Sequence, residues 1–283
     1  MTYKILVLTK YGSLGGSSRY RFYQYLPYLK SQNFDITVAP LLDNEYVTGI
    51  NRGNRNFANV LIRYFQRLGK LIRDRDYDLL WIEKEILPYV PEWLERILIQ
   101  NIPYAVDYDD AQFHTYDYYG SKLTKMFLAQ KIDNVMAHAQ LVIAGNKYIA
   151  IRANKAGAKS IEIIPTVIDL DRYSIKSDDQ SRIFNIGWIG SPGTSSYLNA
   201  IQSVFENVNH KYDCTFTLVG AGQLKLGNID LIIKDWHESS EVEDIKTFDV
   251  GIMPLDNTPW EQGKCGIKLI QYMACALPVV GTP

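Results

Sequence analysis

Short apolar runs alternate with helical patterns along this chain. The run YKILVLT at residues 3–9 is rich in aliphatic and β-branched side chains, which is typical of a buried strand. Apolar residues spaced three apart over residues 20–29 then predict a helix. Further strand-like runs follow, each separated from the next by room for a helix or crossover, at residues 35–39, 78–82, 104–106, 141–144, 184–188, 215–219, 229–233, 249–253 and 278–280.

This alternation predicts an α/β protein built on doubly wound parallel sheets with right-handed crossovers. The 283 residues exceed a typical single α/β domain and fit two domains. A polar stretch without helical periodicity separates the two series of strands. We therefore expect a first domain at residues 1–165, a linker at residues 166–182 and a second domain at residues 183–283.

Composition narrows the functional class. Hydrophobic residues make up 47% of the chain and charged residues 22%, as in an ordinary soluble protein. The net charge of −1 argues against a nucleic-acid partner, because binding to phosphate backbones needs a basic excess. No apolar run approaches the roughly 20 residues that span a bilayer, and the first run is shorter than a signal-peptide core. Three scattered cysteines form no disulfide framework, so we expect a cytoplasmic protein.

Residues 51–75 depart from this balance, with seven basic residues against one acid. An apolar stripe with basic residues opposite predicts an amphipathic helix over residues 61–75. Such a helix either exposes a solvated face or rests on an anionic membrane, which would make the protein peripheral at the inner membrane face. The stripe consists of Leu61, Phe65, Leu68 and Ile72, the residues opposite are Arg63, Arg67 and Lys70, and the other basic residues are Arg52, Arg55, Arg73 and Arg75.

The last thirty residues, 254–283, pass from a polar loop to a helical pattern and then to a buried strand. Gly263 and Gly266 lie at the entry to the predicted helix, beside Lys264 and Lys268. The first amides of a helix lack partners within it and its dipole is positive there, so the helix start favours anions. We favour this interpretation over two merely solvated lysines, because the lysines flank a glycine at such a terminus.

Five segments together resemble GT-B glycosyltransferases of the retaining, glycogen-synthase-like class (family 4-like, or group 1), and they occur in that family's order along the whole chain. The resemblance implies two Rossmann-like domains facing a cleft. It also implies a nucleotide-diphosphate sugar as donor, a saccharide or lipid-linked hydroxyl acceptor, retention of configuration, and no metal or other cofactor. Cell-surface polysaccharide or glycolipid synthesis is the expected setting. The segments are SSRYRFYQYLPYL (17–29), DYDDAQF (107–113), IIPTVIDLDRY (163–173), IGWIGSPGTSSYL (186–198) and PLDNTPWEQGKCGIKLIQYMACALPVVGTP (254–283).

The terminal segment departs from the family at two glutamates that commonly stand eight residues apart. This chain has Gly263 at the first position and Gln271 at the second, and Glu261 is out of register. Gln271 is therefore the donor-binding candidate that its position implies.

A second departure concerns the loop at residues 190–195, which resembles the family's diphosphate-contacting loop. Many relatives carry an arginine and a lysine there, whereas this chain has glycines and hydroxyl residues. We expect Gly190, Ser191 and Thr194 to hold the diphosphate through backbone amides and hydroxyls. Lys264 and Lys268 would then supply the positive charge.

Trp236 and His237 follow the predicted strand at residues 229–233, where the family's architecture holds the nucleotide base. We expect Trp236 to stack on the base with His237 beside it. A buried tryptophan with a purely structural role is the alternative.

A glycine loop at residues 12–16 follows the first predicted strand. Gly15 and Gly16 would let the backbone approach a phosphate or sugar closely, and Arg19 would contact a donor phosphate or the acceptor. A tight turn and an exposed arginine are the alternatives. The spacing is not G-x-G-x-x-G, which argues against a dinucleotide oxidoreductase.

Three acids, Asp107, Asp109 and Asp110, follow another predicted strand. Crowded carboxylates repel one another, so such a cluster raises a pKa or recruits a cation such as magnesium. Asp109 stands where the family often has a histidine, and we expect it to orient an acceptor hydroxyl. Asp109, Asp110 and His114 are the catalytic candidates, although a lone histidine is more often structural.

Two other functions remain open at this stage. A noncatalytic nucleotide-sugar sensor or partner subunit of the same fold would explain the missing glutamates and the small-residue loop. A nucleotide-linked dehydrogenase is disfavoured, because the chain lacks the glycine fingerprint of that class.

The run at residues 278–280 is followed by only three residues. Since the resemblance implies further βα units, we expect a C-terminally truncated second domain.

Overall fold

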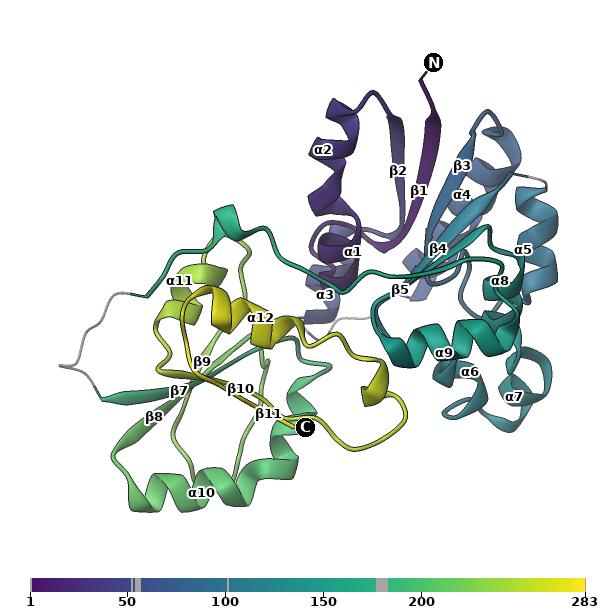
Figure 1. Cartoon of the computed structure of the whole chain (residues 1–283). Helices are drawn as coiled ribbons and strands as arrows, with labels where there is room; N and C mark the ends of the chain where they lie inside the picture. Colours follow the sequence, from purple (N-terminus) through teal and green to yellow (C-terminus); the bar gives the residue numbers. More distant parts are fainter. Residues whose placement is uncertain (1, 52, 54–56, 101, 177–182, 283) are drawn as a thin grey trace. The chain divides into compact units, whose positions relative to one another are not determined.

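The computed structural model describes residues 2–51, 53, 57–100, 102–176 and 183–282. Its contacts divide the chain into two compact units (Figure 1). Unit 1 holds Met1–Ile50, Asn54–Thr166 and the later segment Thr258–Cys265. Unit 2 holds Asn51–Gly53, Val167–Asn257 and Gly266–Pro283. Residues 177–182 of the predicted linker lie outside the described residues.

Unit 1 is built on a six-stranded parallel sheet in the order β2-β1-β3-β4-β5-β6. This order confirms the predicted doubly wound topology, and the chain reverses direction across the sheet between β1 and β3. Five of the strands coincide with predicted apolar runs, give or take a few residues at their ends. The strands are β1 (Lys4–Tyr11), β2 (Asp35–Leu42), β3 (Leu79–Glu83), β4 (Tyr104–Tyr108), β5 (Leu141–Ala144) and β6 (Ile161–Ile163).

Both faces of this sheet are covered, as the alternation along β1 shows. Ile5 and Val7 pack on one face with Phe22, while Leu6 and Leu8 belong to the larger core on the other face. A parallel sheet buried on both sides accounts for the nearly continuous apolar runs in the sequence. The helices of unit 1 are α1 (Gly16–Arg21), α2 (Leu26–Ser31), α3 (Asn44–Asn51), α4 (Phe57–Arg73), α5 (Glu92–Ile99), α6 (His114–Asp117), α7 (Lys122–Leu128), α8 (Lys131–His138) and α9 (Lys147–Ala156).

The helix predicted over residues 20–29 is broken in the structure. Phe22 leaves the helical region with φ −129° and ψ −65°, and α1 ends there. A single 3₁₀ turn follows before α2, whose first turn contains Pro27. Proline is favoured in the first turn of a helix and disrupts a helix interior, so the chain restarts the helix at this residue.

Helix α4 confirms an amphipathic pattern but not the expected division of its faces. Leu61, Phe65 and Ile72 of the apolar stripe are 58%, 66% and 52% exposed. Arg67, assigned to the basic face, is instead buried, and its guanidinium donates hydrogen bonds to backbone carbonyls of three other segments. A side chain with five donors can satisfy several backbone carbonyls at once, which explains its place in the interior. Arg52 and Arg55 of this region lie outside the described residues.

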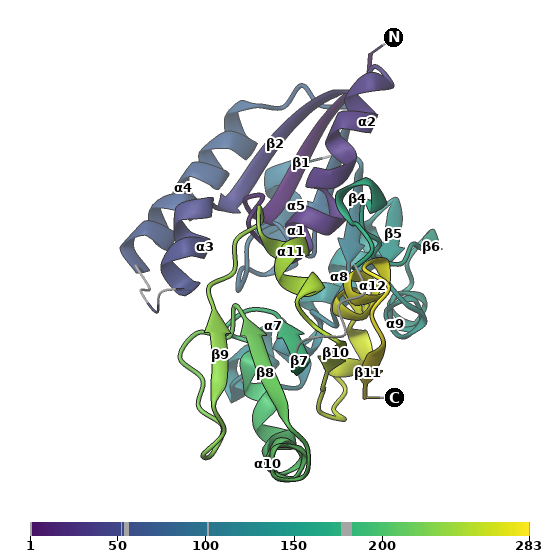
Figure 2. The ribbon, with the colours of Figure 1, turned by 90° about the vertical axis from the view of Figure 1, so that its left-hand side faces the viewer.

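Unit 2 is a five-stranded parallel sheet in the order β11-β10-β7-β8-β9, with the reversal of direction between β7 and β10. Trp188 faces the core beneath α10, whereas Ile189 faces the core beneath α11 and α12. Figure 2 shows the strands and helices of each unit from a second side. The elements are β7 (Phe184–Ile189), α10 (Gln202–Lys211), β8 (Cys214–Val219), β9 (Leu231–Lys234), α11 (Glu241–Lys246), β10 (Val250–Met253), α12 (Ile267–Ala274) and β11 (Val279–Gly281).

Candidate functional site

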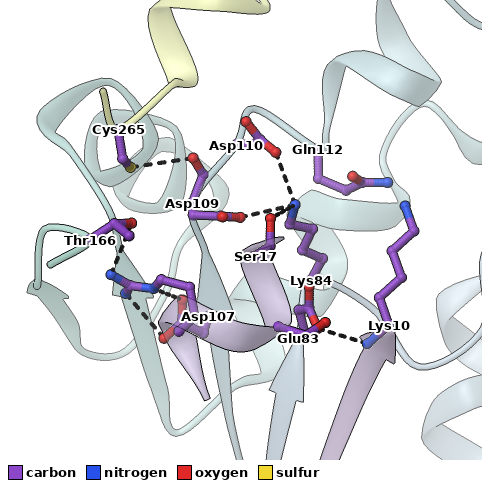
Figure 3. A network of polar contacts seen from close by, with 12 residues as sticks. Lys10, Ser17, Glu83, Lys84, Asp107, Asp109, Asp110, Gln112, Thr166 and Cys265 are labelled. Carbon is purple, nitrogen blue, oxygen red and sulfur yellow. Dashed lines mark hydrogen bonds and ion pairs between the residues drawn. The ribbon is translucent and has the colours of Figure 1, made fainter. Parts of the chain in front are cut away.

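Charged side chains gather at the carboxyl ends of β3 and β4 in unit 1 (Figure 3). Lys84 directly follows β3 in the left-handed backbone region, with φ 64°. Its buried ammonium lies 2.9 Å from Asp109 Oδ1 and 3.0 Å from Asp110 Oδ2. It also donates to the Ser17 hydroxyl over 3.4 Å. A left-handed backbone conformation costs of order 1–3 kcal/mol for a residue other than glycine, so the ion pairs and packing must hold Lys84 in place.

Lys264 is the second cation of this group. Its Nζ lies 3.2 Å from Asp110 Oδ1, so Asp110 is bridged by two ammonium groups. Burial would raise the pKa of Asp110, but Lys84 and Lys264 outweigh it and hold the pKa below its usual range. Burial also opposes the charge of Lys84, yet Asp109 and Asp110 raise the pKa of Lys84 well above its usual value. The Asp110 carboxylate and the Lys84 ammonium are therefore ionised at neutral pH.

Asp107, the remaining acid of the cluster, is paired with Arg21. The guanidinium donates to both carboxylate oxygens over 2.8 and 3.1 Å, and also to the carbonyl oxygen of Ile164 over 2.7 Å. Burial raises the pKa of Asp107 to about 7, with Arg21 acting in the opposite direction. The pKa rise at Asp107 comes mainly from burial and less from the neighbouring acids, whereas at Asp110 the pKa is lowered. This pair joins α1 to β4 and to the segment after β6.

Glu83 ends β3 and connects it to β1 and α1. Its Oε2 accepts hydrogen bonds from the Lys10 amide over 2.7 Å and from the Ser18 hydroxyl over 2.6 Å. Glu83 is 1% exposed, and burial raises its pKa. These contacts place the end of β3, and hence Lys84, at a fixed position between β1 and β4.

His114 belongs to a different network on α6. Its Nδ1 lies 2.7 Å from Asp117, and its Nε2 lies 2.8 Å from the Tyr148 hydroxyl. Arg152 pairs with the same Asp117 over 2.9 Å. Both ring nitrogens are thus engaged, although His114 is only five residues from Asp109 in sequence.

The glycine loop after β1 packs closely against its own strand. A Cβ at Gly15 would lie 2.4 Å from Tyr11 Cβ, whereas one at Gly16 would meet nothing within 4 Å. Arg19 is buried, and its guanidinium donates to the Tyr20 hydroxyl over 2.8 Å. Gly15 therefore has a packing role here, and Arg19 does not have the exposed position that was one of its alternatives.

In unit 2, the loop of residues 190–195 follows β7 at the point where the sheet reverses direction. The Ser191 amide donates to Thr194 Oγ1 over 3.2 Å, and the Thr194 hydroxyl donates to the Ser191 carbonyl over 3.1 Å. Lys268 Nζ lies 3.5 Å from Thr194 Oγ1 and 4.4 Å from the centroid of the Trp188 ring. Ligands of open α/β sheets bind at the carboxyl ends of strands beside such a reversal.

A second polar group of unit 2 contains two predicted donor residues. The Gln271 amide donates to the Tyr173 hydroxyl over 3.0 Å, and that hydroxyl donates to Glu241 over 3.2 Å. The Trp236 indole N–H donates to the same carboxylate over 2.8 Å. His237 lies on the exposed surface beside them in sequence.

The two lysines at the start of α12 do not share an environment. Lys264 contacts the acids of unit 1, whereas Lys268 contacts the β7 loop of unit 2. Gly266 between them is the N-cap of α12 and has a left-handed φ of 65°, which glycine adopts without strain. The structure thus brings Asp109, Asp110 and Lys264 together, and separately Gly190, Thr194 and Lys268.

The described residues show neither a metal site nor a membrane span. No group of three or more His, Cys, Asp or Glu side chains among them is arranged to hold a metal ion. Within the same residues, we found no helix with the length and apolarity needed to cross a membrane.

The sequence matches no protein-family model, and no curated protein matches it. Solved structures resemble it over nearly the whole chain. Sucrose-phosphate synthase from Thermosynechococcus elongatus is 13% identical with a TM-score of 0.67, over 99% of this chain and 81% of that one. WaaG, a glycosyltransferase involved in lipopolysaccharide biosynthesis, is 11% identical with a TM-score of 0.64, over 98% and 80%. An alpha-glucosyltransferase in complex with UDP-glucose and DNA is 13% identical with a TM-score of 0.58, over 99% and 79%. The chain has the GT-B fold, with two Rossmann-like domains.

Several residues of these groups were not identified from the sequence. Lys84, Glu83 and Arg21 were missed in unit 1, and Trp188 and Tyr173 in unit 2. Lys84 could have been predicted from the sequence. It follows a predicted strand, and that strand neighbours the strand of the acids in a doubly wound sheet. The role of Trp188 could not have been predicted, since an apolar residue inside a predicted strand is ordinarily a core residue.

Proposed function

We propose that the protein is a glycosyltransferase that moves a sugar from a nucleotide-diphosphate sugar to a hydroxyl acceptor, with retention of configuration. The observation that carries the proposal is the position of Lys268 beside the loop of residues 190–195, at the reversal point of the unit 2 sheet. The GT-B fold supports it, and a structural neighbour with that fold was solved with UDP-glucose bound.

The donor would bind unit 2. Gly190, Ser191 and Thr194 would contact the diphosphate through amides and hydroxyls, with Lys268 as counter-ion. The nucleoside would lie near Trp236, His237 and Gln271. Glu241 holds the Trp236 indole and the Tyr173 hydroxyl holds the Gln271 amide. Lys264, Gly15, Gly16 and Arg19 remain donor-contact candidates from the unit 1 side of the chain.

Catalysis would be mainly electrostatic and would need no metal ion. Loss of the sugar leaves negative charge on the diphosphate, which a fixed ammonium and oriented amides stabilise without a proton donor. Asp109 and Asp110 would orient the acceptor hydroxyl, because both carboxylates are ion-paired with Lys84. His114 remains a candidate for a contact with the acceptor. Asp117 and Tyr148 would hold its imidazole ring in position.

The acceptor would be a saccharide or a lipid-linked saccharide of cell-surface polysaccharide or glycolipid synthesis. The protein would work in the cytoplasm, peripherally at the inner membrane face. The outward apolar residues of α4, Leu61, Phe65 and Ile72, support this location, because apolar groups flanked by arginine and lysine suit a membrane interface.

The test is a screen with UDP-glucose, UDP-N-acetylglucosamine and GDP-mannose, following thermal stabilisation and release of UDP or GDP, with and without EDTA. Stabilisation with EDTA-insensitive release supports the transferase. Stabilisation without release by any acceptor tried supports the noncatalytic sensor instead. Absence of both for every donor, in a protein that melts cooperatively, contradicts the proposal. Lys268→Met is the matched control, since it removes one charge and keeps the stem length.

A further inference from the structure

We infer that Trp188 is a positioning residue that fixes the Lys268 ammonium against the donor diphosphate and so makes unit 2 selective for nucleoside diphosphates over monophosphates. This inference rests on the proposed function, because it concerns the same donor site. Lys268 would contact the terminal phosphate, and Trp188 would act only through Lys268.

The first support is the contact between the two side chains. Lys268 Nζ lies 4.4 Å from the centroid of the Trp188 ring. Trp188 is 1% exposed and packs in the core with Leu198 and Phe205. The ring quadrupole attracts a cation over its face, and the attraction grows as the pair is desolvated. Since the core immobilises the ring, the ring in turn defines a location for the ammonium.

The second support is how closely the loop passes both groups. A Cβ at Gly190 would lie 2.4 Å from Cη2 and Cζ2 of Trp188 and 2.9 Å from Lys268 Nζ. A side chain at Gly190 would therefore overlap both the ring and the ammonium, so the loop passes close to both groups at this residue. The Thr194 hydroxyl, 3.5 Å from Nζ, adds a polar contact on the loop side.

A platform matters here because lysine is long and flexible. Ordering such a side chain on binding costs roughly two- to tenfold in affinity, and a lysine that is already ordered avoids that cost. The loop of residues 190–195 contains no arginine or lysine of its own. Its diphosphate affinity thus depends on where Lys268 is held.

The experiment measures the affinities for UDP, GDP and the corresponding monophosphates by calorimetry. Trp188→Leu removes the ring, Trp188→Phe keeps an aromatic face, and Lys268→Met removes the charge. Phe216→Leu is the control for core damage, because Phe216 lies in the same core and packs against Phe205. Thermal melts establish that each variant is folded, and Trp188→Phe remains informative if Trp188→Leu does not fold.

We expect Trp188→Leu to weaken diphosphate binding about tenfold and monophosphate binding less than twofold, with Trp188→Phe retaining most of the diphosphate affinity. In the Lys268→Met background, Trp188→Leu should have no further effect on the diphosphate. Equal losses for both nucleotides, equal losses in Phe216→Leu, or an undiminished effect in the Lys268→Met background would each overturn the inference. If the wild-type protein binds neither UDP nor GDP, the proposed function itself fails and the inference with it.

Discussion

The Lys84 ammonium lies 3.0 Å from Asp110 Oδ2, and this ion pair is held at a left-handed backbone position directly after β3. Lys84→Met should destabilise unit 1 by about 2–4 kcal/mol, because it leaves the partly buried Asp109 and Asp110 with one cation fewer. Methionine keeps the backbone strain, so the difference reports the charge. The free energy of unfolding from urea titration measures it.

Asp110→Asn in the Lys84→Met background is the matched test of this explanation. In that background Lys264 is the one cation of this group left for two neighbouring carboxylates, so removing one carboxylate charge should recover part of the lost stability, although Asp110→Asn alone is destabilising. Additive losses in the double variant would show that the Lys84 effect comes from packing and not from charge.

A second prediction concerns the buried Glu95 and its dependence on pH. Glu95 Oε1 accepts from the Leu87 amide and lies 3.0 Å from Lys131 Nζ, which also pairs with Glu85. Burial raises the pKa of Glu95 to about 7, and Lys131 opposes the shift. When a carboxyl has a higher pKa in the folded protein than in the unfolded chain, the free energy of unfolding falls as pH rises between the two pKa values. Glu95→Gln should therefore gain about 1–3 kcal/mol over the wild type between roughly pH 4.5 and 7, and stay level above it.

Glu85→Gln is the contrasting variant for this prediction. Glu85 accepts hydrogen bonds from Gln112, Tyr116 and Lys131, so an amide nitrogen there would face a donor. It should cost about 2–4 kcal/mol at pH 7. Urea titrations from pH 4 to 8 compare the variants, and a pH-independent difference between Glu95→Gln and the wild type would contradict the assignment.

Strand positions could be predicted from the sequence, whereas the partners of charged residues could not. The apolar runs at residues 104–106 and 141–144 lie within β4 and β5, because strands buried on both faces leave a direct trace in the sequence. The acids at the end of β4 were identified for the same reason. Their cation Lys84 is 26 residues from Asp110, and only the crossover from β3 to β4 brings the two together.

The sequence predicted where helices lie better than which of their faces are buried. The buried face of α4 carries Arg67 together with Tyr64, Leu68 and Leu71. The other apolar residues of the pattern, Leu61, Phe65 and Ile72, are exposed. A charged residue that caps strand carbonyls has the same sequence signature as one on the surface. The different environments of Lys264 and Lys268 could likewise not be predicted. The two lysines are only four residues apart, so the sequence places both near the start of one helix.

The exposed apolar residues of α4 lead to a prediction about membranes. Leu61 and Phe65 are one turn apart and more than half exposed, so both can enter the interfacial region of a bilayer. Changing both to serine should lower binding to phosphatidylserine-containing vesicles at least tenfold, since each apolar side chain contributes roughly 1.5–3 kcal/mol when buried. Ile151→Ser on α9 is the control, because Ile151 is 55% exposed on another helix. Sedimentation that shows equal binding for all three proteins would remove α4 as the contact.

The last prediction concerns the close approach of Gly190 to Trp188. Gly190 has an ordinary backbone conformation, so its requirement is for space and not for a special φ. A methyl group there would overlap Cη2 and Cζ2 of the indole, at 2.4 Å from each, and Gly190→Ala should therefore destabilise unit 2 by about 1–3 kcal/mol. Phenylalanine lacks both of those atoms. Although Trp188→Phe alone should also destabilise by leaving a cavity, the double variant should lose less than the sum of the two single losses, because the new methyl group occupies space that the indole has vacated. Urea unfolding of the four proteins measures the coupling, and strictly additive losses would show that the loss in Gly190→Ala does not come from overlap with the indole.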